Sequence, residues 1–368
     1  MKIGILTIPI FENYGGILQA YALQSVLRKI GHDTTLLVDY KAINYKPFYL
    51  WPFVLIRRLF VRYVKHDTTV HIFHEKWSKK QHEFLTQHQC RFIKEKIQIT
   101  QLTNIKDISN LNLSAIIVGS DQVWRPKYVK TIDKYFLSFL PRNSKIKRIA
   151  YAASFGTKEW EFSQQQTEQC AKLAQKFDYI SVREKSGVEL CKYYLKTTAV
   201  FVLDPTLLLN KEDYVSLLSS PQLGTDSKTI FTYILDWSKE KEEFIEKIKI
   251  TLQLTQINID FNDKSQPYSS VEDWLMNFYH ARFIVTDSFH GCVFSIIFNK
   301  PFLAIGNPKR GQERFESLLS TFDLKERLID LNNFDLDIIE REINWDKINQ
   351  IKKDLQNYSI QTLYNSLS

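Results

Sequence analysis

The sequence predicts an α/β protein made of two Rossmann-like, doubly wound domains, and three observations lead to this fold class. The chain has 368 residues, a length that suits two domains of ordinary size. Short apolar runs alternate with helical patterns in its first half, as expected for buried parallel strands joined by helices. After a polar, proline-containing stretch at residues 204–213, the same alternation begins again.

The N-terminal domain is expected over residues 1–205. An apolar strand is expected at residues 2–8, a helix at 15–30 and a second strand at 33–40. Further apolar runs that are typical of buried strands lie at residues 113–119, 148–154, 179–182 and 199–203.

The C-terminal domain is expected over residues 206–340. Its strands are expected at residues 229–235, 256–261, 282–286 and 301–306, alternating with helices at 239–252, 271–280, 292–298 and 314–322. An amphipathic pattern from residue 344 to 367 predicts a final helix, so residues 341–368 are expected to pack back across the domains.

The N-terminal domain carries a basic, aromatic insertion over residues 45–100. Its first part, "YKPFYLWPFVLIRRLFVRYVK", combines aromatic side chains with four cations, Arg57, Arg58, Arg62 and Lys65. Two prolines limit any helix here to residues after about 52. We expect an amphipathic helix that covers the domain, and a helix lying on an anionic membrane surface is the alternative.

Composition excludes several classes of protein. Hydrophobic residues make up 44% and charged residues 24%, which is typical of a globular chain and not of a disordered one. The net charge of +8 is modest, and the basic residues are spread along the chain, so nucleic-acid binding is not expected. The cysteines show no C-x-x-C spacing and no accompanying histidine pattern, so neither a metal site nor a cofactor is expected. No secretory signal and no membrane-spanning run is found, which predicts a cytoplasmic protein.

Polar residues follow the strand expected at residues 282–286, in the stretch "TDSFHGCVFSIIFNKPFLAIGN". Asp287, Ser288 and His290 stand between that strand and a helix, where a plain connection needs only Gly291. Ligands bind outside the carboxyl ends of strands in doubly wound sheets. The histidine can act as a general acid or hold a phosphate at the positive end of the helix, and this functional interpretation is favoured over a turn cap.

Other strand ends also carry polar groups. "NYGG", from Asn13 to Gly16, precedes a helix and suits an anion, although taken alone it is better explained as a tight turn that needs glycine. "GSDQVW" contains Asp121, either a base or a helix cap, and Trp124, which could stack on a sugar. "SVRE" contains Arg183, either an anion clamp or the partner of Glu184.

Taken together and in order, these segments resemble the polysaccharide pyruvyl transferase family. The matching pieces are "NYGGILQAYALQ", "VGSDQVW", "AYAASFG", "SVREKSG", "VLDPTLL" and "TDSFHGCVFSIIFNKPFLAI", which span most of the chain from residue 3 to about 320. The resemblance implies a glycosyltransferase-B-like fold, two Rossmann-like domains facing a cleft. It also implies transfer of a pyruvyl group from phosphoenolpyruvate to sugar hydroxyls of a cell-surface polysaccharide or lipid-linked glycan repeat, at the inner face of the membrane. The product is a pyruvate ketal.

The resemblance also implies roles for particular residues. His290 and Asp121 are expected to be catalytic. The donor is expected to contact the C-terminal domain and one arginine of the N-terminal domain, through Arg183, Ser288, Arg310, Arg314 and Gly291. The acceptor is expected on the N-terminal domain, at Asn13, Tyr14, Gly15, Gly16, Gln19 and Trp124. The family carries Arg-Leu-His where this chain has Ser288-Phe289-His290, so one cation is missing near the donor.

Two other functions remain open at this stage. A nucleotide-sugar-dependent glycosyltransferase, for instance one using a CMP-sugar, would use the same cleft, with His290 near a phosphate. A non-enzymatic glycan-binding protein would use Trp124 and the aromatic insertion only for contacts. The sequence does not identify the acceptor sugar or the oligomeric state.

Overall fold

The computed structural model describes residues 1–11, 13–39, 62, 74–218, 228–307, 311–331 and 334–368. The basic aromatic segment at residues 45–65 lies outside these ranges except for Arg62, so both interpretations of it remain predictions. Arg310 also lies outside them.

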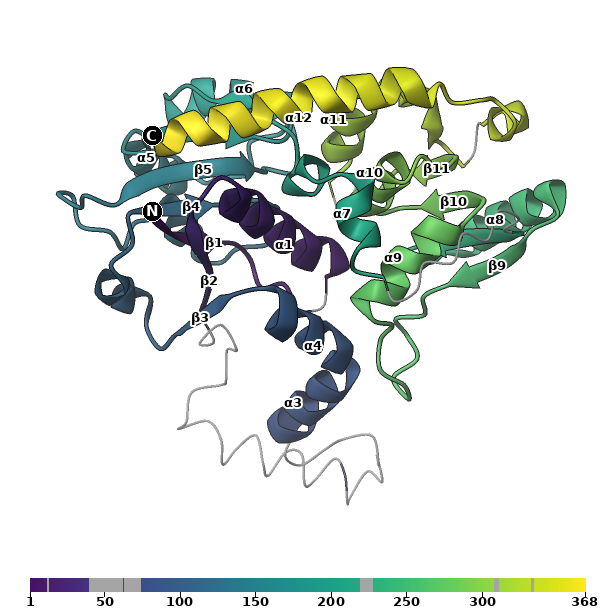
Figure 1. Cartoon of the computed structure of the whole chain (residues 1–368), viewed down its shortest axis with the longest axis horizontal. Helices are drawn as coiled ribbons and strands as arrows, with labels where there is room; N and C mark the ends of the chain where they lie inside the picture. Colours follow the sequence, from purple (N-terminus) through teal and green to yellow (C-terminus); the bar gives the residue numbers. More distant parts are fainter. Residues whose placement is uncertain (12, 40–61, 63–73, 219–227, 308–310, 332–333) are drawn as a thin grey trace.

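The N-terminal domain is built on a seven-stranded parallel sheet with the strand order β3-β2-β1-β4-β5-β6-β7 (Figure 1). Its strands are β1 (Lys2–Leu6), β2 (Asp33–Asp39), β3 (Ile99–Leu102), β4 (Ala115–Val118), β5 (Lys147–Ala153), β6 (Tyr179–Val182) and β7 (Val200–Phe201). Its helices are α1 (Tyr14–Lys29), α3 (His74–Leu85), α4 (Gln87–Lys96), α5 (Gln164–Ala174) and α6 (Lys185–Leu190).

The C-terminal domain is built on a five-stranded parallel sheet with the order β12-β11-β10-β8-β9. Its strands are β8 (Thr229–Tyr233), β9 (Thr255–Asn258), β10 (Phe283–Thr286), β11 (Phe302–Ile305) and β12 (Leu328–Ile329). Its helices are α8 (Lys239–Leu252), α9 (Val271–His280), α10 (Phe289–Ile297) and α11 (Glu313–Thr321), and the short helices η7 (Pro205–Leu208) and α7 (Lys211–Val215) lead into it. The two parallel sheets with intervening helices confirm the predicted α/β fold class.

Two elements differ from the sequence prediction in a way that matters for the site. Helix α10 begins at Phe289, three residues earlier than expected, so His290 lies in its first turn. The extended backbone of Ser288, with φ −108° and ψ 134°, makes that residue the N-cap. Strand β9 ends at Asn258, earlier than expected, and the chain from residue 259 to 270 forms a loop.

Each sheet contains one point at which the strand order reverses. In the first sheet this point lies between β1 and β4, and in the second it lies between β8 and β10. Helices leave opposite faces of the sheet there, which opens a crevice at the carboxyl ends of the two strands. Residues that follow these four strands are therefore the ones placed to meet a ligand.

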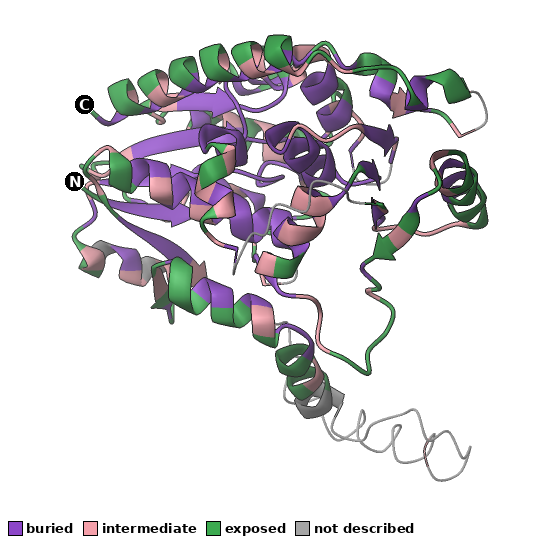
Figure 2. Cartoon of the chain, turned by 45° about the vertical axis from the view of Figure 1, so that its right-hand side comes forward, coloured by how far each residue is buried: buried purple, intermediate pink, exposed green. Residues whose placement is uncertain are grey.

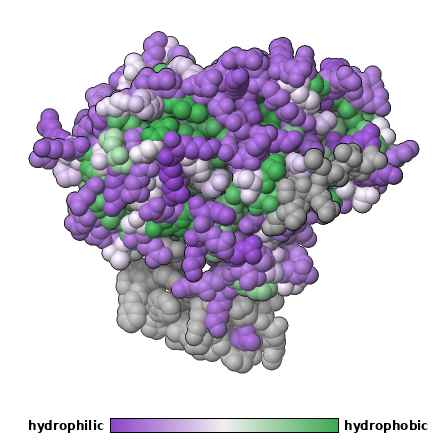
Figure 3. Space-filling model, in the orientation of Figure 1, coloured by the Kyte–Doolittle hydropathy of each residue, from purple (hydrophilic) through white to green (hydrophobic). Residues whose placement is uncertain are grey.

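A single hydrophobic cluster extends through both domains. It contains Ile5 and Leu23 of the first domain together with Phe231 and Trp274 of the second. Tyr14 of α1 stacks on Trp274 with the ring centroids 5.5 Å apart and an interplanar angle of 13°. Figure 2 shows this buried interior as a continuous purple region, whereas Figure 3 shows that most of the visible surface is hydrophilic.

The final helix, α12 (Trp345–Leu367), runs back along both halves of the molecule (Figure 1). Ser359 Oγ accepts a hydrogen bond from the backbone of Leu203 at 3.1 Å, and Gln356 Nε2 donates to the carbonyl of Leu208 at 2.8 Å. At its far end, Lys147 of β5 donates to the carbonyl of Leu367 at 3.1 Å. None of the helices in the described ranges combines the length and apolar character needed to cross a membrane.

Candidate functional site

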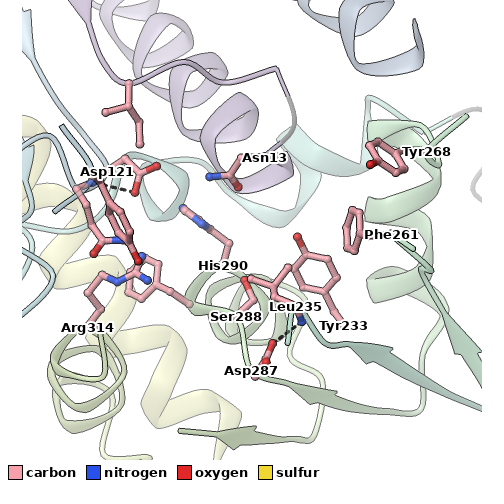
Figure 4. Close-up of a pocket in the computed structure, with 14 residues that line it drawn as sticks. Asn13, Asp121, Tyr233, Leu235, Phe261, Tyr268, Asp287, Ser288, His290 and Arg314 are labelled. Carbon is pink, nitrogen blue, oxygen red and sulfur yellow. Dashed lines mark hydrogen bonds between the residues drawn. The ribbon is translucent and has the colours of Figure 1, made fainter. Parts of the chain in front are cut away.

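A cavity of about 370 Å³ lies between the two domains, at the reversal points of both sheets (Figure 4). From the first domain, Ile8 and Asn13 follow β1, and Asp121 follows β4. From the second domain, Leu235 follows β8 and His290 follows β10. The cavity therefore collects side chains from the carboxyl ends of four strands, as the topology requires.

His290 occupies the centre of the interface between α1 and α10. A Cβ atom added to Gly15 would overlap the imidazole ring, so the ring fills the space that a side chain at position 15 would need. His290 is only 5% exposed, and its Nε2 atom has no hydrogen-bond partner among the described residues. The nearest carboxylate, Asp204 Oδ2, lies 3.9 Å from Nε2. Packing holds this imidazole in place, and its Nε2 atom is available to bind a ligand.

Two helices begin at this point, α1 and α10. Neither has a side-chain cap hydrogen bond, and neither has an acidic residue in its first turn. The first N–H groups of a helix lack partners within the helix, and the aligned peptide dipoles make that end positive. His290, with its free nitrogen, lies beside both helix starts, so the arrangement is suited to an anion.

Arg183 lies at the end of β6 and holds three carboxylates together. Its Nη1 donates to Asp204 at 2.7 Å, its Nη2 to Asp121 at 3.3 Å and its Nε to Glu184 at 3.3 Å. Burial alone would lower the pKa of Arg183, but the three carboxylates outweigh it and raise the pKa. Arg183 was expected to contact the donor directly, and it does not line the cavity. Its nitrogens are turned toward the carboxylates, so its effect on a ligand passes through Asp121 and Asp204.

Asp204 was not predicted as a site residue, although the sequence "LDPT" was noted. Its Oδ1 accepts hydrogen bonds from the backbone N–H and the hydroxyl of Thr206, at 3.0 and 2.6 Å. Burial raises the pKa of Asp204, but Arg183, His290 and the Thr206 hydrogen bonds outweigh it, and the net pKa lies below its usual range. An aspartate directly before a proline at a strand end was the available signal, and it was taken for a domain boundary.

Arg314 brings a cation to the cavity from α11. Its guanidinium carbon lies 5.3 Å from the centroid of the Phe289 ring, and that of Arg183 lies 4.7 Å from the same ring. Burial and the nearby Arg183 lower the pKa of Arg314 to about 10, so it remains charged at neutral pH. The chain thus presents Arg314 beside the strand end where Ser288 replaces the arginine of the family pattern.

The charge state of His290 follows from its surroundings. Burial lowers its pKa most, and Arg183 and Arg314 lower it further, while Asp204 and Asp121 act in the opposite direction. The resulting pKa of about 4 makes the imidazole neutral at pH 7 in the ligand-free protein. A dianion bound at Nε2 would favour the protonated form, so the ring can take up a proton together with a ligand.

Five of the predicted site residues line the cavity, namely Asn13, Asp121, Ser288, His290 and Arg314. Gly15 contacts His290, as described above. Gly16 lies next to the N-cap, where an added Cβ would be 3.3 Å from Asn13 Nδ2. At Gly291 an added Cβ would overlap the hydroxyl of Thr286, so this glycine allows α10 to approach β10 closely.

Trp124, an expected acceptor contact, does not line the cavity. Its side chain is completely buried and stacks on Phe136, with centroids 4.8 Å apart. Its indole nitrogen donates to the carbonyl of Tyr135 at 3.0 Å. The turn after β4 directs Asp121 to the cavity and Trp124 into the core, so no face of the indole is left for a sugar.

Tyr14 and Gln19 also have structural positions that differ from the expected ones. Both are 1% exposed, and neither lines the cavity. The Tyr14 hydroxyl donates to the carbonyl of Ser269 in the other domain at 2.6 Å. Because α1 turns these two side chains toward the protein interior, direct acceptor contacts through them are not available.

One end of the cavity was missed by sequence reasoning. Tyr233, Leu235, Phe261 and Tyr268 line it, at and beyond the carboxyl ends of β8 and β9 (Figure 4). The aromatic residues that follow these strands were visible in the sequence. The apolar pattern at residues 256–261 predicts a strand that includes Phe261, whereas β9 ends at Asn258 and leaves Phe261 in the loop.

Two sets of hydrogen bonds join the domains. In the first, Tyr14 reaches Ser269, and Gln89 Nε2 donates to the same carbonyl at 2.9 Å. In the second, the backbone of Lys185 donates to Ser317 Oγ at 3.2 Å. Within the described residues, no group of three or more His, Cys, Asp or Glu side chains has an arrangement that could hold a metal ion.

Comparisons with known proteins agree with this architecture. The chain is similar in structure to a putative UDP-N-acetylglucosamine 2-epimerase from Listeria monocytogenes, with a TM-score of 0.53, 12% identity and coverage of 97% of this chain and 94% of that one. It also matches the UDP-GlcNAc 2-epimerase from Neisseria meningitidis bound to UDP-GlcNAc (TM-score 0.49, 8% identity, 100% and 99% covered). A third match is Arabidopsis thaliana UGT89C1 complexed with UDP-L-rhamnose (0.49, 9%, 100% and 95%).

These identities show the fold alone, and the fold is the predicted glycosyltransferase-B-like one. No curated protein matches the chain in sequence. The model of the family described as polysaccharide pyruvyl transferase matches residues 13–309, a range that contains the Asn13, Asp121 and His290 positions around the cavity. The chain therefore belongs to the polysaccharide pyruvyl transferase family.

Proposed function

We propose that this protein transfers a pyruvyl group from phosphoenolpyruvate to two sugar hydroxyls of a cell-surface polysaccharide or lipid-linked glycan repeat, forming a pyruvate ketal. The proposal takes the acceptor to be built on a lipid carrier at the inner face of the membrane, with the enzyme in the cytoplasm. Membership of the family supports the transferase class. The observation that carries the choice of donor is His290, a buried imidazole with a free Nε2 beside two helix starts.

Phosphoenolpyruvate carries a phosphate and a carboxylate on a small carbon skeleton. The starts of α1 and α10 offer N–H groups to one of these anions, and Arg314 offers a charge to the other. A neutral His290 imidazole can lie near the Arg314 cation at little electrostatic cost. It becomes protonated when the donor brings in negative charge. Donor binding is therefore expected to be linked to proton uptake and to weaken as the pH rises.

The reaction can be written with all atoms accounted for. A proton adds to the methylene carbon of phosphoenolpyruvate, which becomes a methyl group and leaves an oxocarbenium-like centre at C2. One sugar hydroxyl attacks C2, the C2–O bond to phosphate breaks, and a second hydroxyl of the same sugar closes the ketal. The two hydroxyls release two protons, of which one replaces the proton added to the methylene carbon and the other leaves with inorganic phosphate.

The site offers a group for each proton. Protonated His290 would act as the acid toward the methylene carbon or hold the departing phosphate. Asp121 would accept the proton of the attacking hydroxyl, since its two hydrogen bonds, from Gln122 N–H and Arg183, both end on Oδ1. Arg183 fixes the orientation of that carboxylate without touching the substrate, which makes it a positioning residue.

The test is phosphate release from phosphoenolpyruvate in the presence of a glycan acceptor, compared between the wild-type protein and His290→Ala. A positioned acid–base group contributes about 10²–10⁴-fold in rate, so turnover should fall by that order while circular dichroism remains that of the wild type. Near-full activity of the variant would refute the assignment of His290. Product formed only from a nucleotide sugar, with release of a nucleotide and no reaction of phosphoenolpyruvate, would instead establish the glycosyltransferase alternative.

A further inference from the structure

The cavity has two ends of different chemistry. Asp121 and Arg314 make one end charged, and the neutral His290 imidazole lies with them. Tyr233, Phe261 and Tyr268, named here the aromatic wall, make the other end aromatic. In Figure 4 the aromatic wall lies on one side of Ser288 and His290, and Asp121 and Arg314 lie on the other. A small, doubly charged donor at the charged end leaves this second end unexplained.

We propose that the aromatic wall binds the sugar ring of the acceptor, so that the C-terminal domain contributes to acceptor recognition as well as to donor binding. The inference rests on the proposed function and extends it by assigning the acceptor subsite. It moves the subsite away from Trp124 and Gln19, which are buried elsewhere, and onto residues that face the cavity.

The shape of the wall fits a puckered ring. The Tyr233 and Phe261 centroids are 6.2 Å apart with their planes at 62°, and those of Phe261 and Tyr268 are 5.5 Å apart at 67°. Inclined rings form a corner that accepts the C–H face of a pyranose, while a flat nucleobase prefers a parallel partner. The face of an aromatic ring carries partial negative charge, and the Lys264 ammonium lies over that of Tyr268, 4.8 Å from its centroid. The inclined rings of the wall therefore suit a sugar ring better than a flat base.

The loop that carries Tyr268 is held in position from the other domain. The backbone N–H of Tyr268 donates to the carbonyl of Leu85 at 2.9 Å. The carbonyl of Ser269 accepts from the Tyr14 hydroxyl at 2.6 Å and from Gln89 Nε2 at 2.9 Å. Tyr14 and Gln89 are each 1% exposed, so these bonds are shielded from water. A wall that is fixed before binding loses little conformational freedom when a ligand arrives.

A polar group lies between the two ends of the cavity. Asn13 is exposed at the start of α1, and its side chain makes no cap hydrogen bond to that helix. It lines the cavity together with the aromatic wall and His290. An amide at this point can donate to or accept from sugar hydroxyls, and so turn a stacked ring toward Asp121 and His290.

The test uses the full-length protein, phosphoenolpyruvate and the methyl glycosides of galactose, glucose, mannose and N-acetylmannosamine. Phosphate release gives KM separately for the donor and for the best of the four sugars. Tyr268→Ala should raise the acceptor KM about tenfold, because a stacked ring is lost, with the donor KM changed less than about twofold. Tyr268→Phe, which keeps the ring, should recover most of that loss. Tyr193→Ala removes a tyrosine that is 60% exposed and does not line the cavity, and serves as the matched control.

Calorimetric measurement of phosphoenolpyruvate binding distinguishes a failure of the acceptor-subsite assignment from a failure of the proposed function. If phosphoenolpyruvate binds but none of the four sugars reacts, or if one reacts and Tyr268→Ala leaves its KM unchanged, the assignment of the aromatic wall is overturned and the donor assignment stands. If phosphoenolpyruvate neither binds nor releases phosphate, the proposed function itself fails. If CMP or UDP binds the wild-type protein and Tyr268→Ala abolishes that binding, the wall is a nucleobase site and both proposals are overturned.

Discussion

At the scale of single residues, the contact between Gly15 and His290 links the two domains at the centre of the site. Gly15→Ala places a methyl group where the imidazole lies, whereas Gly16→Ala places one 3.3 Å from the flexible Asn13 side chain. Both glycines are in α1, where alanine itself is favourable. We expect Gly15→Ala to lower kcat about 100-fold by displacing His290, and Gly16→Ala to have a much smaller effect. Steady-state phosphate release measures both, and equal losses in the two variants would contradict the proposed contact.

His290 also makes a prediction for stability that does not depend on the reaction. Its pKa is about 4 in the folded protein, against about 6.5 in an unfolded chain. Between these values the unfolded state binds a proton that the folded state does not, so the free energy of unfolding falls as the pH drops from 6.5 to 4. His290→Gln should remove about 3 kcal/mol of this pH dependence.

Urea denaturation of the wild-type and His290→Gln proteins at a series of pH values measures this difference. Asp204, whose pKa is lowered in the folded protein, adds a loss of stability only below its ordinary pKa of about 3.9, outside the range from pH 6.5 to 4. Parallel pH profiles for the two proteins would show that the pKa of His290 is not lowered in the folded protein.

The sequence predicted which polar side chains lie at strand ends better than it predicted where side chains point. His290, Asp121 and Asn13 lie at strand ends, and topology alone brings strand ends together. Trp124 lies only three residues after Asp121, but the direction of a turn decides whether a side chain meets solvent or core. That direction depends on packing partners such as Phe136. The sequence alone does not show that Phe136 stacks on Trp124.

At the scale of elements, Asp287 ties four segments of the second domain together. Its carboxylate accepts from the backbone of Leu235 at 2.6 Å and of Asp236 at 3.1 Å, and pairs with Lys241 of α8 at 2.7 Å. The Asn307 amide also donates to it at 3.4 Å. The side chain of Asp287 is fully buried, so its charge is satisfied entirely by the protein.

Breaking this network should destabilise the domain strongly. Asp287→Ala leaves the buried Lys241 ammonium without its carboxylate, a change that costs about 3–5 kcal/mol of folding free energy. The matched control is Lys239→Met on the same helix, whose partner Glu243 is exposed, and little change is expected there. Guanidinium denaturation compares the two. A loss below about 1 kcal/mol for Asp287→Ala would show that water replaces the carboxylate.

Elements with clear boundary signals were predicted to the residue. Helix α8 begins after Ser238 and helix α9 after Ser270, and each serine accepts a hydrogen bond from the third residue of its helix. The strands β3 and β12 were not predicted. They are short strands at sheet edges, where few apolar residues are needed, so no periodic pattern marks them.

At the scale of the whole molecule, the shared hydrophobic cluster makes the two domains one cooperative unit. Tyr14 of the first domain packs on Trp274 of the second, and α12 contacts the first domain after the chain has completed the second. We expect a single unfolding transition, since neither domain can lose its core without exposing that of the other. Native-state hydrogen exchange at Ile5 and Phe231 measures this. Loss of protection at clearly different denaturant concentrations would show that the domains unfold independently.

The way the two domains face each other could not be predicted from the sequence, although each domain could. A doubly wound pattern repeats within each half, but the contacts that orient the halves, such as Tyr14 with Ser269 and Lys185 with Ser317, join single residues far apart in the chain. These residues carry no local pattern. The family resemblance predicted a cleft between the domains. The aromatic wall is evident only in the structure, where the two halves lie together.

The path of α12 has a consequence for the synthesis of the protein. Residues 345–367 leave the ribosome long after the first sheet has been translated, yet Ile348 and Leu363 belong to the shared core, and Leu203 and Lys147 find their hydrogen-bond partners on this helix. Domains normally mature in order as the chain emerges. Until α12 has been synthesised, the apolar surface of the N-terminal half that this helix covers stays exposed. We therefore expect the nascent chain to need chaperone protection until translation is nearly complete.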